Sequence, residues 1–154
     1  MKTRRHVGGF LLALFILLTP ASAQDIGAIQ QALTGTFQGT FRWEGTQEVQ
    51  RVVLAFGVAS MTGDGRLTAR GRGLYDVAGV VTTVDIECQI DPNSLLFEMR
   101  EVNPQGNADF VTDGSHVGSM SPDLRTISTV WTTTATGKRG VMVLTGQAPL
   151  PPRR

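Results

Sequence analysis

The segment from Gly79 to Ile90 alternates between two kinds of side chain, and this pattern constrains the fold more than any other feature of the sequence. One set of alternate positions carries Val80, Thr82, Val84, Ile86, Cys88 and Ile90, and the other carries Val81, Thr83, Asp85, Glu87 and Gln89. Successive side chains of a β-strand point to opposite faces. The segment is therefore predicted to be a strand with one buried and one solvated face.

The same period of two recurs along most of the chain after residue 34. The predicted inward sets are Phe37, Phe41 and Trp43; Val52, Leu54, Phe56 and Val58; Leu67, Ala69 and Tyr75; and Leu95, Phe97 and Met99. Turn-forming sequences at 63–65, 91–93, 103–106 and 121–123 separate the sets. About eight short strands, with no helix beyond a turn at 26–33, predict an all-β fold. We expect a small up-and-down antiparallel barrel, with a two-sheet β-sandwich as the alternative.

Charged residues occupy the predicted outer face. If residues 75–79 form a turn, Arg70 and Arg72 lie opposite Glu87 and Asp85, and the next hairpin brings Arg100 near Asp85. Opposite charges on neighbouring strands predict a solvated charge ladder rather than an anion site. A charged outer face also differs from the apolar band of an outer-membrane barrel.

The first 23 residues have the pattern of a cleaved signal peptide. Basic residues at positions 2, 4 and 5 precede an apolar run over 7–18, and Ala-Ser-Ala follows at 21–23. Export by either the general or the twin-arginine route places the mature protein in the periplasm or outside the cell. No later segment approaches 18 apolar residues, so no membrane span is expected after cleavage. The expected order is a lead-in at 24–34, the barrel domain at 35–147 and a disordered tail at 148–154.

Removal of the signal peptide changes the net charge of the chain. Three of the 14 basic residues lie in the signal peptide, whereas all 13 acidic residues follow it, which leaves a net charge of −2. A chain without a basic excess lacks the electrostatic signature of a nucleic-acid-binding protein. We expect no nucleic-acid partner.

Few residues in the mature chain support catalysis. It has one histidine, His116, and one cysteine, Cys88, so we expect no metal site, no cofactor and no intramolecular disulfide. Cys88 is expected to be buried and inert. His116 is expected at the rim or surface, where it would make one hydrogen bond. If its strand face points inward, His116 would be the only ionisable side chain that points into the barrel with polar neighbours. Alternation places Glu98 and Glu101 on opposite faces, so they do not predict a catalytic pair, and we expect a protein without enzymatic activity.

Trp131 is the strongest candidate for a binding residue. Alternation places it on one face with Ile127, Thr129 and Thr133, which gives a large ring among hydroxyl groups. The interior of an eight-stranded barrel is just wide enough to be filled by side chains or to hold one small ligand. We expect a mostly filled interior with a pocket at one mouth. The predicted ligand-binding residues are Trp131, Thr129, Thr133, His116 and Trp43.

Three short motifs resemble those of calycin-like barrels, the secreted meander barrels that include lipocalins and avidins. They are LTGTF at 33–37, GRLT at 65–68 and ISTVW at 127–131. The resemblance implies the barrel fold, and it matches Trp131 to a ligand-stacking tryptophan of avidins. The chain departs from the lipocalin Gly-x-Trp motif, because Gly39-Thr40-Phe41 carries phenylalanine in place of tryptophan. Biotin binding is not implied.

These observations favour an exported barrel that binds a small, partly apolar ligand near Trp131. The alternative is an envelope protein-interaction module or inhibitor that uses loops such as 44–48 or 103–109. A catalytic barrel is the third possibility, because fold does not fix function. An apolar cavity at Trp131 would favour the first reading, and a filled barrel with a large exposed apolar patch would favour the second.

Overall fold

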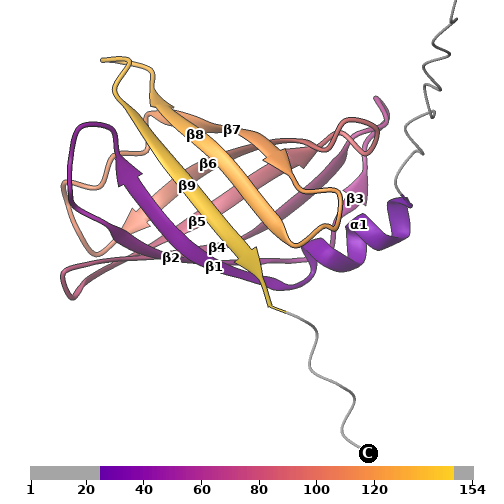
Figure 1. The fold of residues 1–154 in the computed structure, drawn as a ribbon, viewed down its shortest axis with the longest axis horizontal. Helices are drawn as coiled ribbons and strands as arrows, with labels where there is room; N and C mark the ends of the chain where they lie inside the picture. The colour runs from indigo at the N-terminus through magenta and orange to yellow at the C-terminus, as the bar shows by residue number, and fades with distance from the viewer. Residues whose placement is uncertain (1–24, 148–154) are drawn as a thin grey trace, which may run out of the picture.

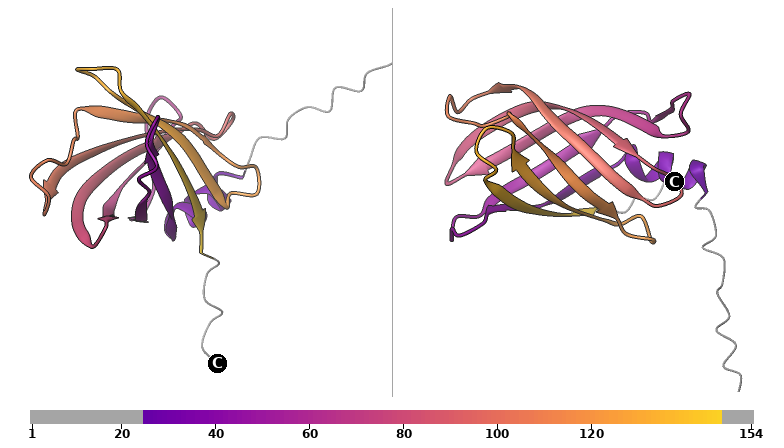
Figure 2. Two further views of the ribbon diagram at one scale, coloured as in Figure 1. Left: turned by 60° about the vertical axis from the view of Figure 1, so that its left-hand side comes forward. Right: turned by 90° about the horizontal axis from the view of Figure 1, so that it is seen from above.

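Eight antiparallel strands, each hydrogen-bonded to the next along the chain, form a closed barrel in the computed structural model, which describes residues 25–147. The barrel strands are β1 (Thr36–Trp43), β2 (Gln50–Phe56), β4 (Leu67–Val77), β5 (Val80–Ile90), β6 (Leu96–Gln105), β7 (Gly114–Met120), β8 (Thr126–Thr133) and β9 (Arg139–Gly146). Pairing of β1 with β9 and of β2 with β4 completes the circle. The predicted barrel is confirmed, and the sandwich alternative is wrong. Figure 1 shows the strands running obliquely around the barrel, and Figure 2 shows two further views.

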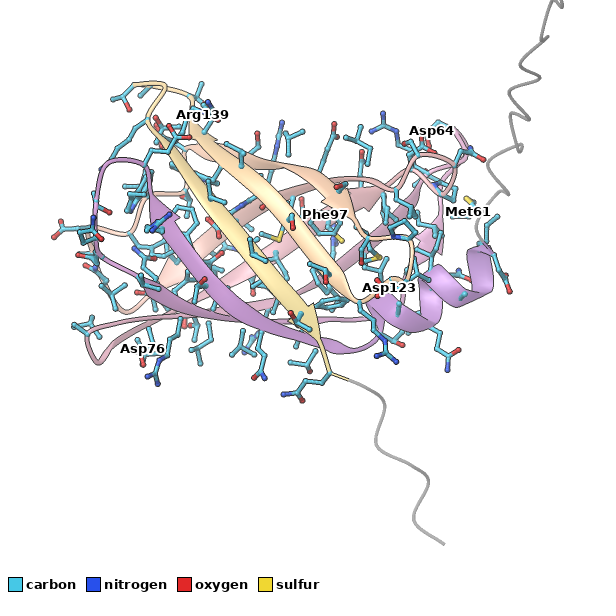
Figure 3. All side chains as sticks on the ribbon, viewed as in Figure 1. Met61, Asp64, Asp76, Phe97, Asp123 and Arg139 are labelled. Atoms are coloured by element: carbon cyan, nitrogen blue, oxygen red, sulfur yellow. The ribbon has the colours of Figure 1, made fainter. Side chains whose placement is uncertain are left out.

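The predicted inward faces are largely buried. Along β5, Thr82, Val84, Ile86, Cys88 and Ile90 are buried, and the intervening side chains are exposed or half-buried. The inward residues of β8 follow the prediction in the same way: Ile127, Thr129, Trp131 and Thr133 are all buried. Figure 3 shows Phe97 among the strands, whereas Asp76 and Arg139 lie at one end of the barrel and Asp64 and Asp123 at the other.

One end of the barrel is covered by the helix α1 (Ile26–Leu33), which is longer than the single turn expected there. The Asp25 side chain caps the helix by accepting a hydrogen bond from Gly27 N at 2.9 Å. Ile29 and Leu33, one turn apart on the same helix face, are fully buried against the core. Gln30 Nε2 also donates to the carbonyl of Ala59, at 3.0 Å. The two-residue strand β3 (Ser60–Met61) pairs with the start of β4 near the same end.

The simple alternation fails at two valines predicted to point inward. Val58 is 81% exposed, because β2 ends at Phe56 and the chain turns outward, leaving Ala59 to pack into the core. Val80 is 53% exposed, because it directly follows the tight turn at Ala78 and Gly79, both of which have positive φ. The predicted turn at 103–106 is also wrong at its start, since β6 continues to Gln105.

The outer charge ladder forms as predicted on β4 and β5. Arg70 pairs with Glu87 at 3.2 Å, and Arg72 lies 3.8 Å from Asp85. Arg100, however, lies directly opposite Glu87, whereas Asp85 lies opposite Val102. The turn joining β5 to β6 is longer than assumed, because Ile90 pairs with Phe97. These ion pairs are solvated, so each contributes only about 0–1 kcal/mol.

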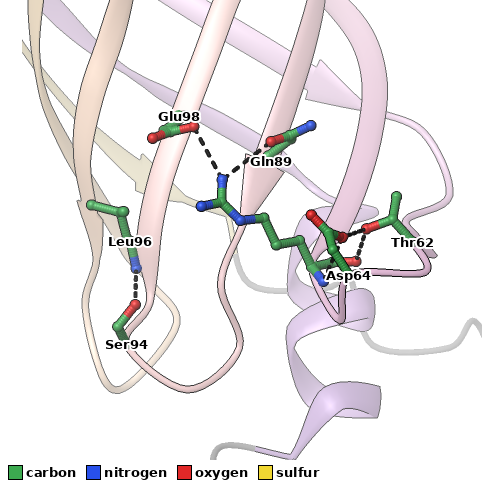
Figure 4. Close-up of polar contacts among 7 residues, drawn as sticks. Thr62, Asp64, Gln89, Ser94, Leu96 and Glu98 are labelled. Atoms are coloured by element: carbon green, nitrogen blue, oxygen red, sulfur yellow. Dashed lines mark hydrogen bonds and ion pairs between the residues drawn. The ribbon is translucent and has the colours of Figure 1, made fainter.

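A further arginine joins the ladder near the helix-covered end. Arg66 donates to Glu98 and to Gln89, both at 3.3 Å. Figure 4 shows these two acceptors on neighbouring strands. The neighbouring Thr62–Asp64 contact orders the turn that leads into β4.

The predicted signal peptide (1–23) and tail (148–154) lie outside the described residues. Within residues 25–147, no helix is long and apolar enough to cross a membrane.

Candidate functional site

A cavity of about 270 Å³ opens at the barrel end that lies away from α1, and we call it the mouth cavity. The last residue of β1, the first of β2 and the last of β4 contribute to it, together with the connection between β6 and β7. Its lining comprises Phe41, Trp43, Glu48, Gln50, Tyr75, Val77, Glu101, Asn107, Asp109, Phe110, Val111, His116, Trp131 and Lys138. Its volume is just below the range of about 300–1,000 Å³ typical of ligand pockets, which suits a small molecule.

Aromatic rings form two sides of the mouth cavity. Trp43 stands nearly perpendicular to both Phe41 and Trp131, with ring centroids 5.1 and 4.9 Å away. Phe110 lies 5.0 Å from Tyr75 and comes from the loop between β6 and β7. The edge-to-face packing of Trp43 on Phe41 and Trp131 fixes the positions of these rings. The rings therefore form a preorganised apolar wall.

Two glycines create the space that these rings occupy. A Cβ atom at Gly140 would lie 2.6 Å from Cε2 of Phe41, and one at Gly114 would lie 2.7 Å from Cε2 of Trp131. Both separations are far below van der Waals contact. Any larger residue at these positions would displace a ring of the cavity wall.

Trp131 is both a core residue and part of the cavity lining. Its side chain is 2% exposed and packs edge-to-face on Trp43. Its indole Nε1 is the one fully buried side-chain nitrogen or oxygen without a hydrogen-bond partner among the described residues. Buried donors are nearly always paired, so an unpaired one beside a cavity requires an explanation.

Beneath the aromatic wall lie four hydrogen-bonded side chains that we call the buried polar cluster: Tyr75, Glu101, His116 and Thr129. Glu101 Oε1 contacts the Tyr75 hydroxyl and lies 3.2 Å from His116 Nε2. The other histidine nitrogen, Nδ1, lies 3.1 Å from the Thr129 hydroxyl. An ionised Glu101 can only accept, so Tyr75 and His116 Nε2 then both donate to it.

The electrostatics of the cluster keep Tyr75 a hydrogen-bond donor. Burial is the main cause that raises the pKa of Tyr75 well above its ordinary value, and the charge of Glu101 and the hydrogen bond to it act in the same direction. The phenol therefore stays protonated. Glu101 is 4% exposed, and both contacts use the same carboxylate oxygen.

The second oxygen of Glu101 remains available to the cavity. Both contacts of the carboxylate within the cluster are made by Oε1, and Oε2 is not among the fully buried atoms that lack a partner. Glu101 lines the mouth cavity, so this oxygen gives the base of the cavity an acceptor.

The structure corrects two expectations for His116. The side chain is 1% exposed and has two partners, so it is not a rim or surface histidine with one hydrogen bond. Nor is it the only ionisable group inside the barrel, because Glu101 and Tyr75 contact each other beside it. The reason is the continued alternation of β6, which carries Glu101 inward after Phe97 and Met99.

The five residues predicted to bind ligand separate into three groups. Trp131, Trp43 and His116 line the mouth cavity. Thr129 is not among the residues that line the cavity. Within the buried polar cluster, its hydroxyl contacts only Nδ1 of His116. Thr133 is buried at the end of β8, where its hydroxyl lies 2.6 Å from that of Thr136 and accepts from Lys138 N at 3.1 Å.

Sequence reasoning missed several residues that line the cavity. The alternation already placed Glu101 inward, but a carboxylate in a core was not expected. Phe110 lies in the loop between β6 and β7, and the sequence of that loop did not indicate that it lines a cavity. Lys138 places its ammonium 4.3 Å from the centre of the Trp43 ring, a contact that only the folded hairpin reveals.

Other chemistry-bearing groups lie elsewhere. Cys88 is buried, and burial raises the pKa of its thiol to about 12. No group of three or more histidine, cysteine, aspartate or glutamate side chains within residues 25–147 is placed to hold a metal. A second, wider hollow of about 930 Å³ lies along β4 to β7, where Arg70 and Glu87 of the outer ladder pair with each other. The mouth cavity is thus the better candidate site.

Comparison of the sequence with models of known families and with curated proteins finds no match. The geometry of the mouth cavity is therefore the basis for a proposed function.

Proposed function

We propose that this protein is an exported, non-enzymatic β-barrel that binds a small, partly apolar ligand in the mouth cavity. The observation that carries the proposal is the cavity itself, which opens at the barrel end opposite α1 and has Trp131 in its wall. Ligand pockets are typically concave and mainly apolar, with a few polar groups that orient the ligand. Here the rings supply the apolar wall, and Glu101 and His116 supply polar groups at its base.

The calycin-like resemblance is compatible with this proposal. The closed eight-stranded antiparallel meander is the architecture that such barrels use to enclose small ligands. The unpaired Trp131 N–H adds a specific polar requirement. A bound acceptor that drew the ring slightly toward the cavity would satisfy a donor that has no partner in the described chain.

Fluorescence of Trp131 tests the proposal. A Trp43→Phe variant leaves Trp131 as the single tryptophan of the chain, while retaining a ring at position 43. We expect small ring-containing compounds to change Trp131 emission saturably and to alter its quenching by acrylamide. A Trp131 that is fully protected from the quencher and insensitive to every compound would contradict ligand binding at the mouth.

The location of the protein has its own test. Protein recovered from the cell envelope or the medium should have the intact mass of a chain that begins at Gln24. Recovery of exported protein with Met1 still attached would contradict cleavage after residue 23.

A protein-binding module is a second candidate, and one observation favours it. Val117, Val130 and Val141 form a cross-strand row on the outer face of β7, β8 and β9, and Val143 lies next to the row on β9. Val117, Val141 and Val143 are each more than 40% exposed. If this surface binds a partner, Val141→Lys should abolish that interaction without changing ligand binding at the mouth.

A further inference from the structure

We infer that the mouth cavity selects a small organic cation: an ammonium group carried by an apolar, ring-sized body. The inference rests on the proposed function and specifies the charge of the ligand, whose acceptor for the Trp131 N–H would lie elsewhere on its body. It follows from the charges around the cavity and from the position of one lysine.

Carboxylates predominate among the charged residues of the lining. Glu48, Glu101 and Asp109 line the cavity, whereas Lys138 is the one lysine or arginine among its lining residues. Glu48 and Asp109 are exposed, and neither forms an ion pair within the part of the chain that the structure describes. Carboxylates at the rim of a low-dielectric cleft attract cations and repel anions.

The aromatic wall already receives a positive charge from the protein itself. The Lys138 ammonium lies 4.3 Å from the centre of the Trp43 ring, within the range of a cation–π interaction. Lys138 belongs to the exposed hairpin between β8 and β9, so its side chain can leave without disturbing the barrel. On this reading, the Lys138 ammonium occupies the position of the ligand's charged group when no ligand is bound.

The base of the cavity also suits a cation. Glu101 lines the cavity, and both of its contacts with Tyr75 and His116 use Oε1, so its carboxylate can also accept from an N–H donor of the ligand. His116 does not offer an anion a free donor, because both of its ring nitrogens already have partners, Thr129 and Glu101.

Three probes with one skeleton test the inference: 2-phenylethylamine as the cation, 2-phenylethanol as the neutral compound and phenylacetate as the anion. Binding is measured by calorimetry on the mature protein at neutral pH. We expect the amine to bind about tenfold more tightly than the alcohol, and phenylacetate to bind most weakly. Added salt should reduce the advantage of the amine, because rim carboxylates are screened.

Variants assign the preference to particular residues. Glu48→Gln combined with Asp109→Asn should bring the amine and the alcohol to within about threefold, because the rim charges are lost. Glu44→Gln is the matched control: Glu44 lies at the same end of the barrel but pairs with Arg139 at 3.7 Å and does not line the cavity. Its effect on the ratio should be negligible.

Lys138→Met gives the sharpest test, because it removes the internal cation and keeps an unbranched stem. We expect the amine to bind more tightly to this variant than to the wild type, since Trp43 is no longer occupied. The inference would be overturned if phenylacetate bound to the wild type more tightly than the other two probes and lost this binding in Lys138→Met. Lys138 would then be an anion anchor. Equal binding of all three probes would overturn the charge selection alone. Binding of none of them would count against the proposed function as well.

Discussion

Replacement of Trp131 by phenylalanine should change the free energy of unfolding by no more than about 1.5 kcal/mol, even though the residue is 2% exposed. Buried aromatic side chains cover about 150–250 Å² each, so the exchange loses at most about 100 Å² of buried area. At about 25 cal/mol/Å², that loss costs up to about 2.5 kcal/mol. The exchange also removes a buried N–H that has no partner, a group whose burial costs about 1–3 kcal/mol.

The two terms oppose each other, so Trp131→Phe should lie within about 1.5 kcal/mol of the wild type. Trp131→Ala removes the ring and should cost about 3–5 kcal/mol. Tyr75→Phe is the matched control, because it also removes one polar hydrogen from a buried ring, but that hydrogen is bonded to Glu101. Its loss should cost about 1–3 kcal/mol.

Urea unfolding followed by far-ultraviolet circular dichroism measures these differences. The reasoning would be refuted if Trp131→Phe cost as much as Trp131→Ala, or if Tyr75→Phe cost nothing. The first result would mean that Trp131 is only a tightly packed core residue with a satisfied N–H. The second would mean that Glu101 does not need the Tyr75 donor.

Three further predictions follow from burial and packing. Val84→Asp should prevent folding because it buries an unpaired charge, whereas Thr83→Asp on the exposed face should cost less than about 0.5 kcal/mol; equal stability in urea would contradict the strand register. Gly140→Ala should cost about 1–3 kcal/mol and weaken binding at the mouth, because it displaces the Phe41 ring; unaltered unfolding and affinity would contradict the packing. Cys88 should react with a thiol reagent at pH 8 only after unfolding in urea, because its pKa is raised to about 12; rapid labelling of the native protein would contradict its burial.

The alternation of side chains predicted much of the fold, because a strand's period of two is a local property. It assigned Val84 and Ile86 to the core, and it placed Arg70 opposite Glu87 once the turn at 75–79 was recognised. It failed at Val58, since a period cannot show where a strand ends. It also misplaced Arg100, because the pairing of β5 with β6 depends on the geometry of one turn.

The candidate site was only partly predictable. Trp131 was singled out because alternation placed a large ring among hydroxyl groups on one face, and it lines the mouth cavity together with Trp43. The partners of His116 were not found, although Glu101 lies on the predicted inward face, because only the folded barrel shows that Tyr75 and His116 satisfy its carboxylate. The cavity depends on how deeply each ring extends into the barrel, which no pattern of residue types specifies.

Nuclear magnetic resonance of the two tryptophan indole groups tests the central claim most directly. The mature protein, labelled with ¹⁵N at tryptophan, has two indole N–H signals, which the Trp43→Phe variant assigns. During titration with a library of small fragments that includes the three phenyl probes, binders should shift the Trp131 signal saturably, and the Trp43 signal should shift with it. If millimolar fragments left the Trp131 signal unmoved, or shifted only signals from the outer valine row, the mouth cavity would not be a binding site.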